Sequence, residues 1–235
     1  MRSQMALTSL HLLLPQQLTT IGWMDFVASL PGHKVLDNGA AEGELAAIDQ
    51  LSRLLDTALF HEVVIPDKLT NYAWTLEAAK IYKHLKDDFP HVQMMAVVQG
   101  STLAEITSCY NAYLHSMPWI DVIGLPRVLN EQFGEQSRLK FVESFQNNPD
   151  FNGKPIHCLG AYYNWPEEIR QLKHYPIVRS MDSSMPYVYG LYGMSFDDDI
   201  GNRKRPDGYF DIVPDKVQEE CIIDNVVRYI KWAEQ

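Results

Sequence analysis

The segment QMMAVVQGSTLAEITSCYNAYLHSMPWIDVIGL, residues 93–125, decides the fold class of this chain. Its first part, Gln93–Gln99, is a short apolar run with β-branched residues, which predicts a buried strand. Apolar residues recur at three- and four-residue spacing over Leu103–Ser116 and predict an amphipathic helix, and Trp119–Leu125 predicts a second strand. This order is typical of parallel strands joined by a helical crossover.

The same alternation continues on both sides of this segment. Further strands are predicted at Thr8–Leu14, Lys34–Asp37, Glu62–Pro66, Ile156–Ala161, Ile177–Met181 and Tyr187–Tyr192, and further helices at Glu42–Leu59, Tyr72–Lys86, Gln136–Phe145, Pro166–His174 and Asp215–Ala233. Eight such units predict one α/β domain over residues 1–235, a compact (β/α)8 TIM-type barrel. Six or seven would leave an open doubly wound sheet. No GxGxxG motif follows the first strand, so nothing favours the dinucleotide-binding form.

Composition and cysteine spacing narrow the class of protein. The 235 residues are 46% hydrophobic and 21% charged, which is ordinary for a globular domain. No apolar stretch approaches the roughly 20 residues of a membrane helix, so we expect a soluble, cytoplasmic protein with no membrane partner. Cys109, Cys158 and Cys221 lie far apart without CxxC spacing, which predicts reduced thiols and no local metal site.

The charge balance argues against a broad nucleic-acid surface. The net charge is −10, whereas proteins that bind phosphate backbones usually carry a basic face. One tight basic cluster, Arg203-Lys204-Arg205, follows the acidic run Asp197-Asp198-Asp199. The cluster is either a solvated loop of mixed charge or a local contact with nucleic acid. Any such binding must be local or helped by a partner.

Polar residues and glycines gather where the predicted strands end. In a (β/α)8 barrel, catalytic groups sit at these carboxyl ends. Three of the groups are carboxylates, Asp37, Asp67 and Asp182, and three acids at one rim repel each other unless a ligand or a function needs them. Each acid taken alone is also explained as a helix cap or a turn former. Other strands end in Gln99-Gly100, Gly124-Leu125 and Gly160-Ala161.

This ordered series resembles the tRNA-guanine transglycosylases, and especially their reduced bacteriophage relatives, the DNA 7-deazaguanine transglycosylases. The family's Asp-Ser-Gly-Gly-aromatic-Gln stretch is similar to Asp37-Asn38-Gly39-Ala40-Ala41-Glu42, and its Val-Gln-Gly motif matches Val98-Gln99-Gly100. Gly124-Leu125 resembles the family's Gly-Leu pair, and Cys158-Leu159-Gly160 resembles its Leu-Met-Gly stretch. Asp182-Ser183-Ser184-Met185-Pro186 resembles its Asp-Cys-Val-x-Pro stretch, and residues 202–210 resemble its basic segment before Gly-x-Leu-Phe. The resemblance covers residues 34–210.

The chain also departs from the family. The family's zinc site of three cysteines and a histidine has no counterpart, so a zinc-free chain with no metal and no cofactor is expected. The tRNA-specific insertions are missing, which favours DNA as the substrate. Ala41 replaces the aromatic ring that stacks on the base, and Glu42 replaces the glutamine that reads it.

The resemblance implies a role for each residue. Asp182 would be the nucleophile at the sugar C1′ and Asp37 the acid/base partner, in a double displacement like that of the retaining glycosidases. The implied base-binding residues are Asp67, Gln99, Gly124, Leu125, Leu159, Gly160 and Glu42. The implied partners are nucleic acid and a free 7-deazaguanine base, with an accessory protein or a homodimer left open.

The expected contacts with nucleic acid are few. Arg179 lies in a predicted strand beside the proposed nucleophile and would contact phosphate or neutralise the carboxylates. Arg203, Lys204 and Arg205 resemble the family's basic segment and would bind the backbone. If the protein is encoded by a phage, the host cytoplasm is the expected compartment.

Three other functions stay open. Base exchange could occur on tRNA instead of DNA. A glycosidase or nucleosidase acting on a small substrate would use water in place of the second base, and the acidic composition favours this choice. A barrel that binds a nucleobase without catalysis is the third.

Overall fold

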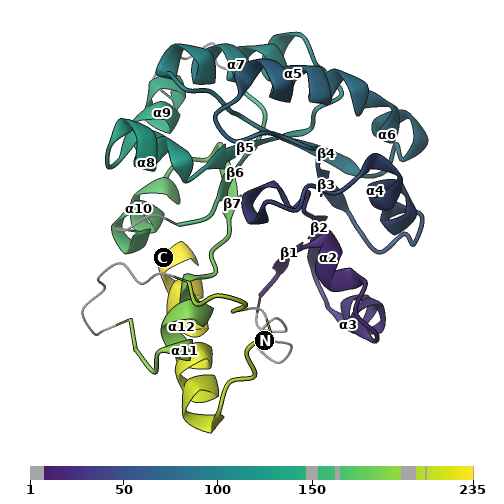
Figure 1. Ribbon diagram of the computed structural model, residues 1–235. Helices are drawn as coiled ribbons and strands as arrows, with labels where there is room; N and C mark the ends of the chain where they lie inside the picture. The colour runs from purple at the N-terminus through teal and green to yellow at the C-terminus, as the bar shows by residue number, and fades with distance from the viewer. Residues whose placement is uncertain (1–7, 147–152, 162–164, 197–204, 210, 235) are drawn as a thin grey trace. The chain divides into compact units, whose positions relative to one another are not determined.

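The computed structural model describes residues 8–146, 153–161, 165–196, 205–209 and 211–234 (Figure 1). Seven strands form one sheet in the order β1-β2-β3-β4-β5-β6-β7. Every neighbouring pair from β1 to β5 is parallel. The α/β class is therefore confirmed. The strands are β1 (Leu10–Leu13), β2 (His33–Leu36), β3 (Glu62–Val64), β4 (Gln93–Val97), β5 (Val122–Pro126), β6 (Ile156–Leu159) and β7 (Val178–Met181).

The predicted eighth strand is wrong. Tyr187–Tyr192 lies almost wholly within helix α11 (Met185–Leu191), so the described residues hold seven strands and not eight. Every residue of α11 is buried, and a short run that is apolar on all sides cannot be assigned to helix or strand by periodicity. Pro186, in the first turn, favours the helix because its fixed φ suits that position.

Two long predicted helices are divided. The predicted helix Glu42–Leu59 starts at the last residue of a 3-10 turn, η1 (Ala40–Glu42), which ends at Gly43 with a φ of +76°. Its α-helical part is α4 (Ile48–Leu55). Tyr72–Lys86 is divided at Tyr82 into α5 (Tyr72–Ile81) and α6 (Lys83–Asp88).

Four further predicted helices stand within one or two residues of their expected bounds, and three short helices were not predicted. The first set is α7 (Leu103–His115), α9 (Ser137–Gln146) and α10 (Trp165–Leu172), together with the closing helix α12 (Lys216–Glu234). The second set is α2 (Pro15–Leu18), α3 (Trp23–Ser29) and α8 (Val128–Phe133). These three are four to seven residues long, too short for a helical period to stand out in the sequence.

The chain divides into two compact units. The amino-terminal unit comprises Ser9–Pro126 and Asp150–His157, and the carboxyl-terminal unit comprises Met1–Thr8, Arg127–Pro149 and Cys158–Gln235. In the amino-terminal unit, helices α4 to α7 lie along the outer side of strands β2 to β5 (Figure 1). The strands are almost entirely buried, as expected of parallel strands that are covered on both faces.

Helices α11 and α12 pack against each other in the carboxyl-terminal unit (Figure 1). The two helices approach closely at Gly190, where an added Cβ would lie 2.2 Å from a side-chain carbon of Ile222 and 2.7 Å from its Cα. Tyr187, Val188 and Leu191 bury their side chains in the same cluster. None of the described helices has both the length and the apolar character needed to cross a membrane.

Candidate functional site

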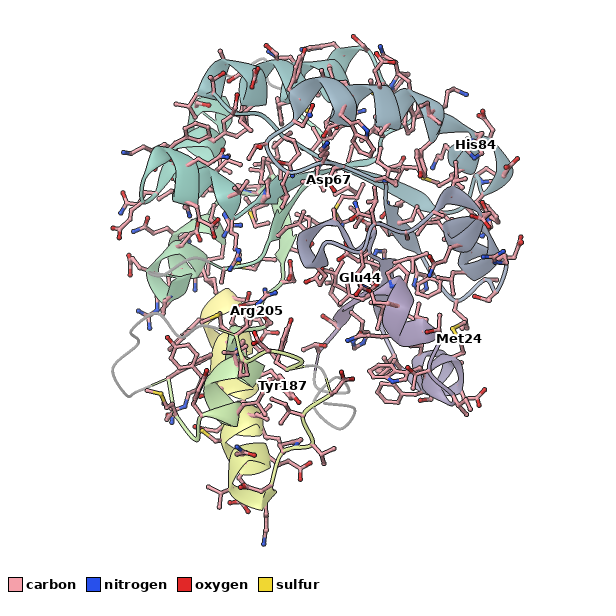
Figure 2. The ribbon with its side chains drawn as sticks, in the orientation of Figure 1. Met24, Glu44, Asp67, His84, Tyr187 and Arg205 are labelled. Atoms are coloured by element: carbon pink, nitrogen blue, oxygen red, sulfur yellow. The ribbon has the colours of Figure 1, made fainter. Side chains whose placement is uncertain are left out.

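The first candidate site is built around Asp67, which follows β3 in the amino-terminal unit. Its side chain is only 5% exposed and lies among the strands and loops of this unit (Figure 2). Asn38, after β2, donates from its Nδ2 to Asp67 Oδ1 at 2.7 Å, and Gln99, after β4, donates from its Nε2 to Oδ2 at 2.6 Å. Parallel register therefore carries the ends of three neighbouring strands to one carboxylate.

Backbone groups fix the orientation of both amides. The Oδ1 of Asn38 accepts the N–H of Ala40 at 2.8 Å, so its NH2 group faces Asp67 and the carbonyl of Ile65. The Oε1 of Gln99 accepts the N–H of Thr70 at 3.0 Å. Both amides are therefore held as donors to the carboxylate.

Thr70 adopts an unusual backbone conformation to make its contact. Its φ is +60°, in the left-handed region that a β-branched residue rarely occupies. Such a conformation costs on the order of 1–3 kcal/mol and persists only where the surroundings enforce it. Strain of this kind is typical of functional sites, and here it supplies the N–H that orients Gln99.

Burial and hydrogen bonding act in opposite directions on Asp67. Burial raises the pKa of Asp67 above its ordinary value, while the hydrogen bonds from Asn38 and Gln99 lower it. Burial is the larger effect. Because each carboxylate oxygen has a second lone pair, a ligand N–H could still bind to either oxygen.

Asp37 lies next to this group at the end of β2. Its carboxylate is half-buried, and its Oδ1 accepts the backbone N–H of Asn38 at 2.8 Å. Its own N–H donates to the carbonyl of Leu13, the last residue of β1, at 2.9 Å, which continues the β1–β2 pairing one residue past the end of β2. The proposed acid/base residue therefore adjoins Asn38, the residue that orients Asp67.

The other predicted base-binding residues of this unit are placed at strand and loop positions. Gly124 and Leu125 lie within β5 and are buried, and the carbonyl of Gly124 accepts the N–H of Val98 at 3.0 Å. Glu42 ends the 3-10 turn η1 and is half-buried. Their contacts with a base stay predictions.

The second candidate group surrounds Asp182, which follows β7 in the carboxyl-terminal unit. Its side chain is half-buried, and its Oδ1 accepts the backbone N–H of Gly160 at 3.0 Å. Its own N–H donates to the carbonyl of Cys158 at 3.2 Å. Gly160 has a φ of +68°, which favours glycine, and an added Cβ would lie 3.1 Å from the Cδ of Arg127. The predicted wall residue Leu159 ends β6 and is half-buried.

The predicted phosphate-binding residues are only partly described. Arg179 is an exposed residue of β7. Arg205 is half-buried, with its guanidinium 5.4 Å from the centre of the Tyr209 ring (Figure 2). Arg203 and Lys204 lie outside the described residues.

The structure thus brings the predicted residues together in two sets. Asp37, Asp67 and Gln99 belong to the amino-terminal unit, and Asp182, Leu159 and Gly160 belong to the carboxyl-terminal unit. The described residues hold no group of three or more His, Cys, Asp or Glu side chains that could bind a metal ion. Comparison of the chain with models of known protein families gave no match, and a search of curated proteins gave none either.

Two polar residues of the amino-terminal site, Asn38 and Gln16, have no role predicted from the sequence. Asn38 is 2% exposed and orients Asp67, and its only signal in the sequence was its place between Asp37 and Gly39.

Gln16 follows β1, and its Nε2 lies 3.4 Å from where a Cβ on Gly39 would be. Its Oε1 is buried and has no hydrogen-bond partner among the described residues. Nothing in the sequence indicates this proximity, because it depends on the pairing of β1 with β2.

Proposed function

We propose that this protein is a transglycosylase that exchanges guanine in DNA for a free 7-deazaguanine base, through a covalent intermediate on Asp182. The observation that carries the proposal is the buried carboxylate of Asp67, which two fixed amides hold at the carboxyl ends of three parallel strands. A TIM-type barrel architecture, the cytoplasmic location and membership of the transglycosylase family are parts of the same proposal.

Recognition of the base follows from the hydrogen-bonding pattern of guanine. Its ring N–H and exocyclic amine are adjacent donors, and the carboxylate of Asp67 offers an acceptor for each. The N–H groups of Gln99 and Gly124 would donate to the carbonyl oxygen of the base. A buried acceptor rejects bases that lack these donors, because its own hydrogen bonds would then stay unmade.

The reaction would proceed in two displacements at the sugar C1′. An Asp182 oxygen attacks C1′, the bond from C1′ to the base nitrogen breaks, and its electron pair leaves with guanine as Asp37 transfers a proton to the base. The incoming base then loses a proton to Asp37 and attacks C1′. The ester bond to Asp182 breaks, and its electron pair restores the carboxylate.

An N-glycosidase is the second candidate, and the net charge of −10 favours it. Water would then attack C1′ in the second step, and free base would be released without incorporation. A small neutral substrate would avoid the repulsion that an acidic protein exerts on a phosphate backbone.

The test is incorporation of labelled guanine, or of a labelled 7-deazaguanine base, into DNA and into tRNA in parallel. We expect incorporation into DNA and, in denaturing mass spectrometry of protein incubated with DNA, an adduct on Asp182. Asp182→Asn should remove both signals, because an amide oxygen is a much weaker nucleophile.

The matched control is Asp211→Asn, at an exposed acid of the same unit, which should keep both signals. Incorporation into tRNA alone would identify the substrate as tRNA. Release of base without incorporation would identify the glycosidase. Full activity of Asp182→Asn would refute the mechanism.

A further inference from the structure

A buried ion pair joins helices α9 and α10 in the carboxyl-terminal unit. Arg138 and Glu168 are 2% and 3% exposed. The Nε of Arg138 donates to Oε1 of Glu168 at 2.9 Å and its Nη2 donates to Oε2 at 2.7 Å, which is the bidentate geometry of a strong charge-assisted pair.

Stability alone does not explain this pair. The cost of removing two charges from water commonly equals or exceeds their attraction, and apolar replacements of similar volume are often neutral or stabilising. The remaining contacts of the pair are therefore informative. The Nη1 of Arg138 donates to the carbonyls of Leu159 and Gly160, each at 3.0 Å, which are the last residue of β6 and the residue that follows it.

Asn130 of helix α8 forms hydrogen bonds with both residues of the pair. Its Nδ2 donates to Oε1 of Glu168 at 2.7 Å, and its Oδ1 accepts the backbone N–H of Arg138 at 2.9 Å. Residues of three helices therefore hold this ion pair, and hydrogen bonds to two carbonyls fix the guanidinium relative to the end of β6.

The peptide groups of Gly160 connect this network to Asp182. Its carbonyl accepts from Arg138, while its N–H donates to Oδ1 of Asp182 at 3.0 Å. The φ of +68° at Gly160 allows the two groups to point to different partners. A shift of the guanidinium would move this glycine, and with it the donor to the carboxylate.

We propose that the buried Arg138–Glu168 pair is a positioning device for Asp182. It fixes the Gly160 N–H on Oδ1 of Asp182 and so sets the orientation of the carboxylate that would attack the substrate. This inference rests on the proposed function, because it takes Asp182 as the reacting group. The pair is neutral as a whole, so it orients the carboxylate without cancelling its charge. The neighbouring Cys158 thiol is neutral too, since burial raises its pKa to about 12.

The test uses the double variant Arg138→Met with Glu168→Leu, which replaces the pair by apolar side chains. We expect a folded protein whose midpoint of urea unfolding is unchanged or higher. We expect the single-turnover rate of adduct formation on Asp182 to fall on the order of 100-fold, the cost of misplacing a reacting group by about 1 Å. The KM for the free base should stay within about twofold, because the base contacts assigned to Asp67 are untouched.

Two further variants separate positioning from folding. Arg138→Lys keeps the positive charge but loses the bidentate geometry of the guanidinium, so this variant should retain intermediate activity. The same variant tests the proposal if the double variant does not fold. Arg228→Met removes an arginine from a more exposed pair with Asp224 in the same unit and should leave the rate unchanged. A folded double variant with the wild-type rate would overturn the proposal.

A readout without substrate keeps this inference distinct from the proposed function. The Gly160 amide should show slow hydrogen exchange by NMR in the wild type and exchange at least tenfold faster in the double variant. If the wild type catalyses no base exchange, the proposed function fails, and this amide still decides whether the pair positions Asp182. Equal exchange in both proteins would refute the positioning.

Discussion

At the scale of single residues, Asp67 shows how one carboxyl group is set for recognition. Burial favours its neutral form and the two amide donors favour its charged form, with burial the stronger effect. If the amides of Asn38 and Gln99 rotated to accept a proton from a neutral acid, they would lose their hydrogen bonds from the N–H groups of Ala40 and Thr70. The site is therefore built for an acceptor at Asp67, even though ionisation there opposes folding.

This opposition predicts how stability depends on pH. The folded-state pKa of Asp67 is raised above its ordinary value of 3.8, so the folded protein holds this proton more tightly than the unfolded chain does. The stabilisation is fully present below about pH 3.8 and is lost as pH rises through the folded-state pKa, by about 1.4 kcal/mol for each unit of difference.

Asp67→Asn removes this dependence. The difference in the free energy of unfolding, variant minus wild type, should grow more positive as pH rises through that window and then level off. Lost hydrogen bonds shift it by an amount that does not vary with pH, so only the slope is diagnostic. Urea unfolding at pH 4 to 8 measures this slope, and Asp49→Asn, at an exposed aspartate, is the control. A difference that is flat with pH would contradict the role of burial.

At the scale of secondary-structure elements, the close approach of α11 and α12 depends on Gly190. Alanine is ordinarily preferred to glycine in a helix by about 1 kcal/mol. Here the added Cβ would lie 2.7 Å from backbone atoms of Ile222, so the helices would have to separate. Packing should override propensity.

We therefore expect Gly190→Ala to lower the free energy of unfolding by on the order of 3 kcal/mol. The control is Gly193→Ala, where the added Cβ meets no atom within 4 Å and only the φ of +66° opposes the change. It should cost about 1 kcal/mol. Urea unfolding of both variants decides the matter: a Gly190→Ala protein as stable as the wild type would show that the two helices do not need this contact.

At the scale of the whole molecule, the net charge of −10 limits how nucleic acid can bind. Four basic residues, Arg179, Arg203, Lys204 and Arg205, are the predicted phosphate contacts. Each neutralised phosphate contributes about −0.9 to the slope of log affinity against log salt concentration on duplex DNA.

The slope should therefore be no steeper than about −3.6, the value for four contacts. Fluorescence anisotropy of labelled duplex DNA between 50 and 200 mM salt, concentrations over which this dependence is commonly measured, gives the slope directly. Arg179→Gln should make it shallower by about 0.9. A slope near −8 would mean that a basic surface of another kind carries the binding.

The site could be predicted from sequence only in part. Asp67 and Gln99 were found because each follows a buried strand, and parallel strands end at one edge. Asn38 and Gln16 also follow strands, but no role was predicted for either, and Arg138 lies inside a helix far in sequence from the strand end it contacts. The contacts that define these roles, such as Asn38 with Asp67 and Arg138 with Glu168, join residues 20 or more positions apart, and local patterns do not encode such distances.

The order of hydrophobic runs by itself determined the α/β class and seven of the strands, because the spacing of apolar residues reports which faces are buried. Only the tertiary structure decided that Tyr187–Leu191 is helical, that an arginine and a glutamate are buried together, and that two amides hold Asp67. Those outcomes depend on contacts between distant segments, where packing and unmet hydrogen bonds outweigh local preference.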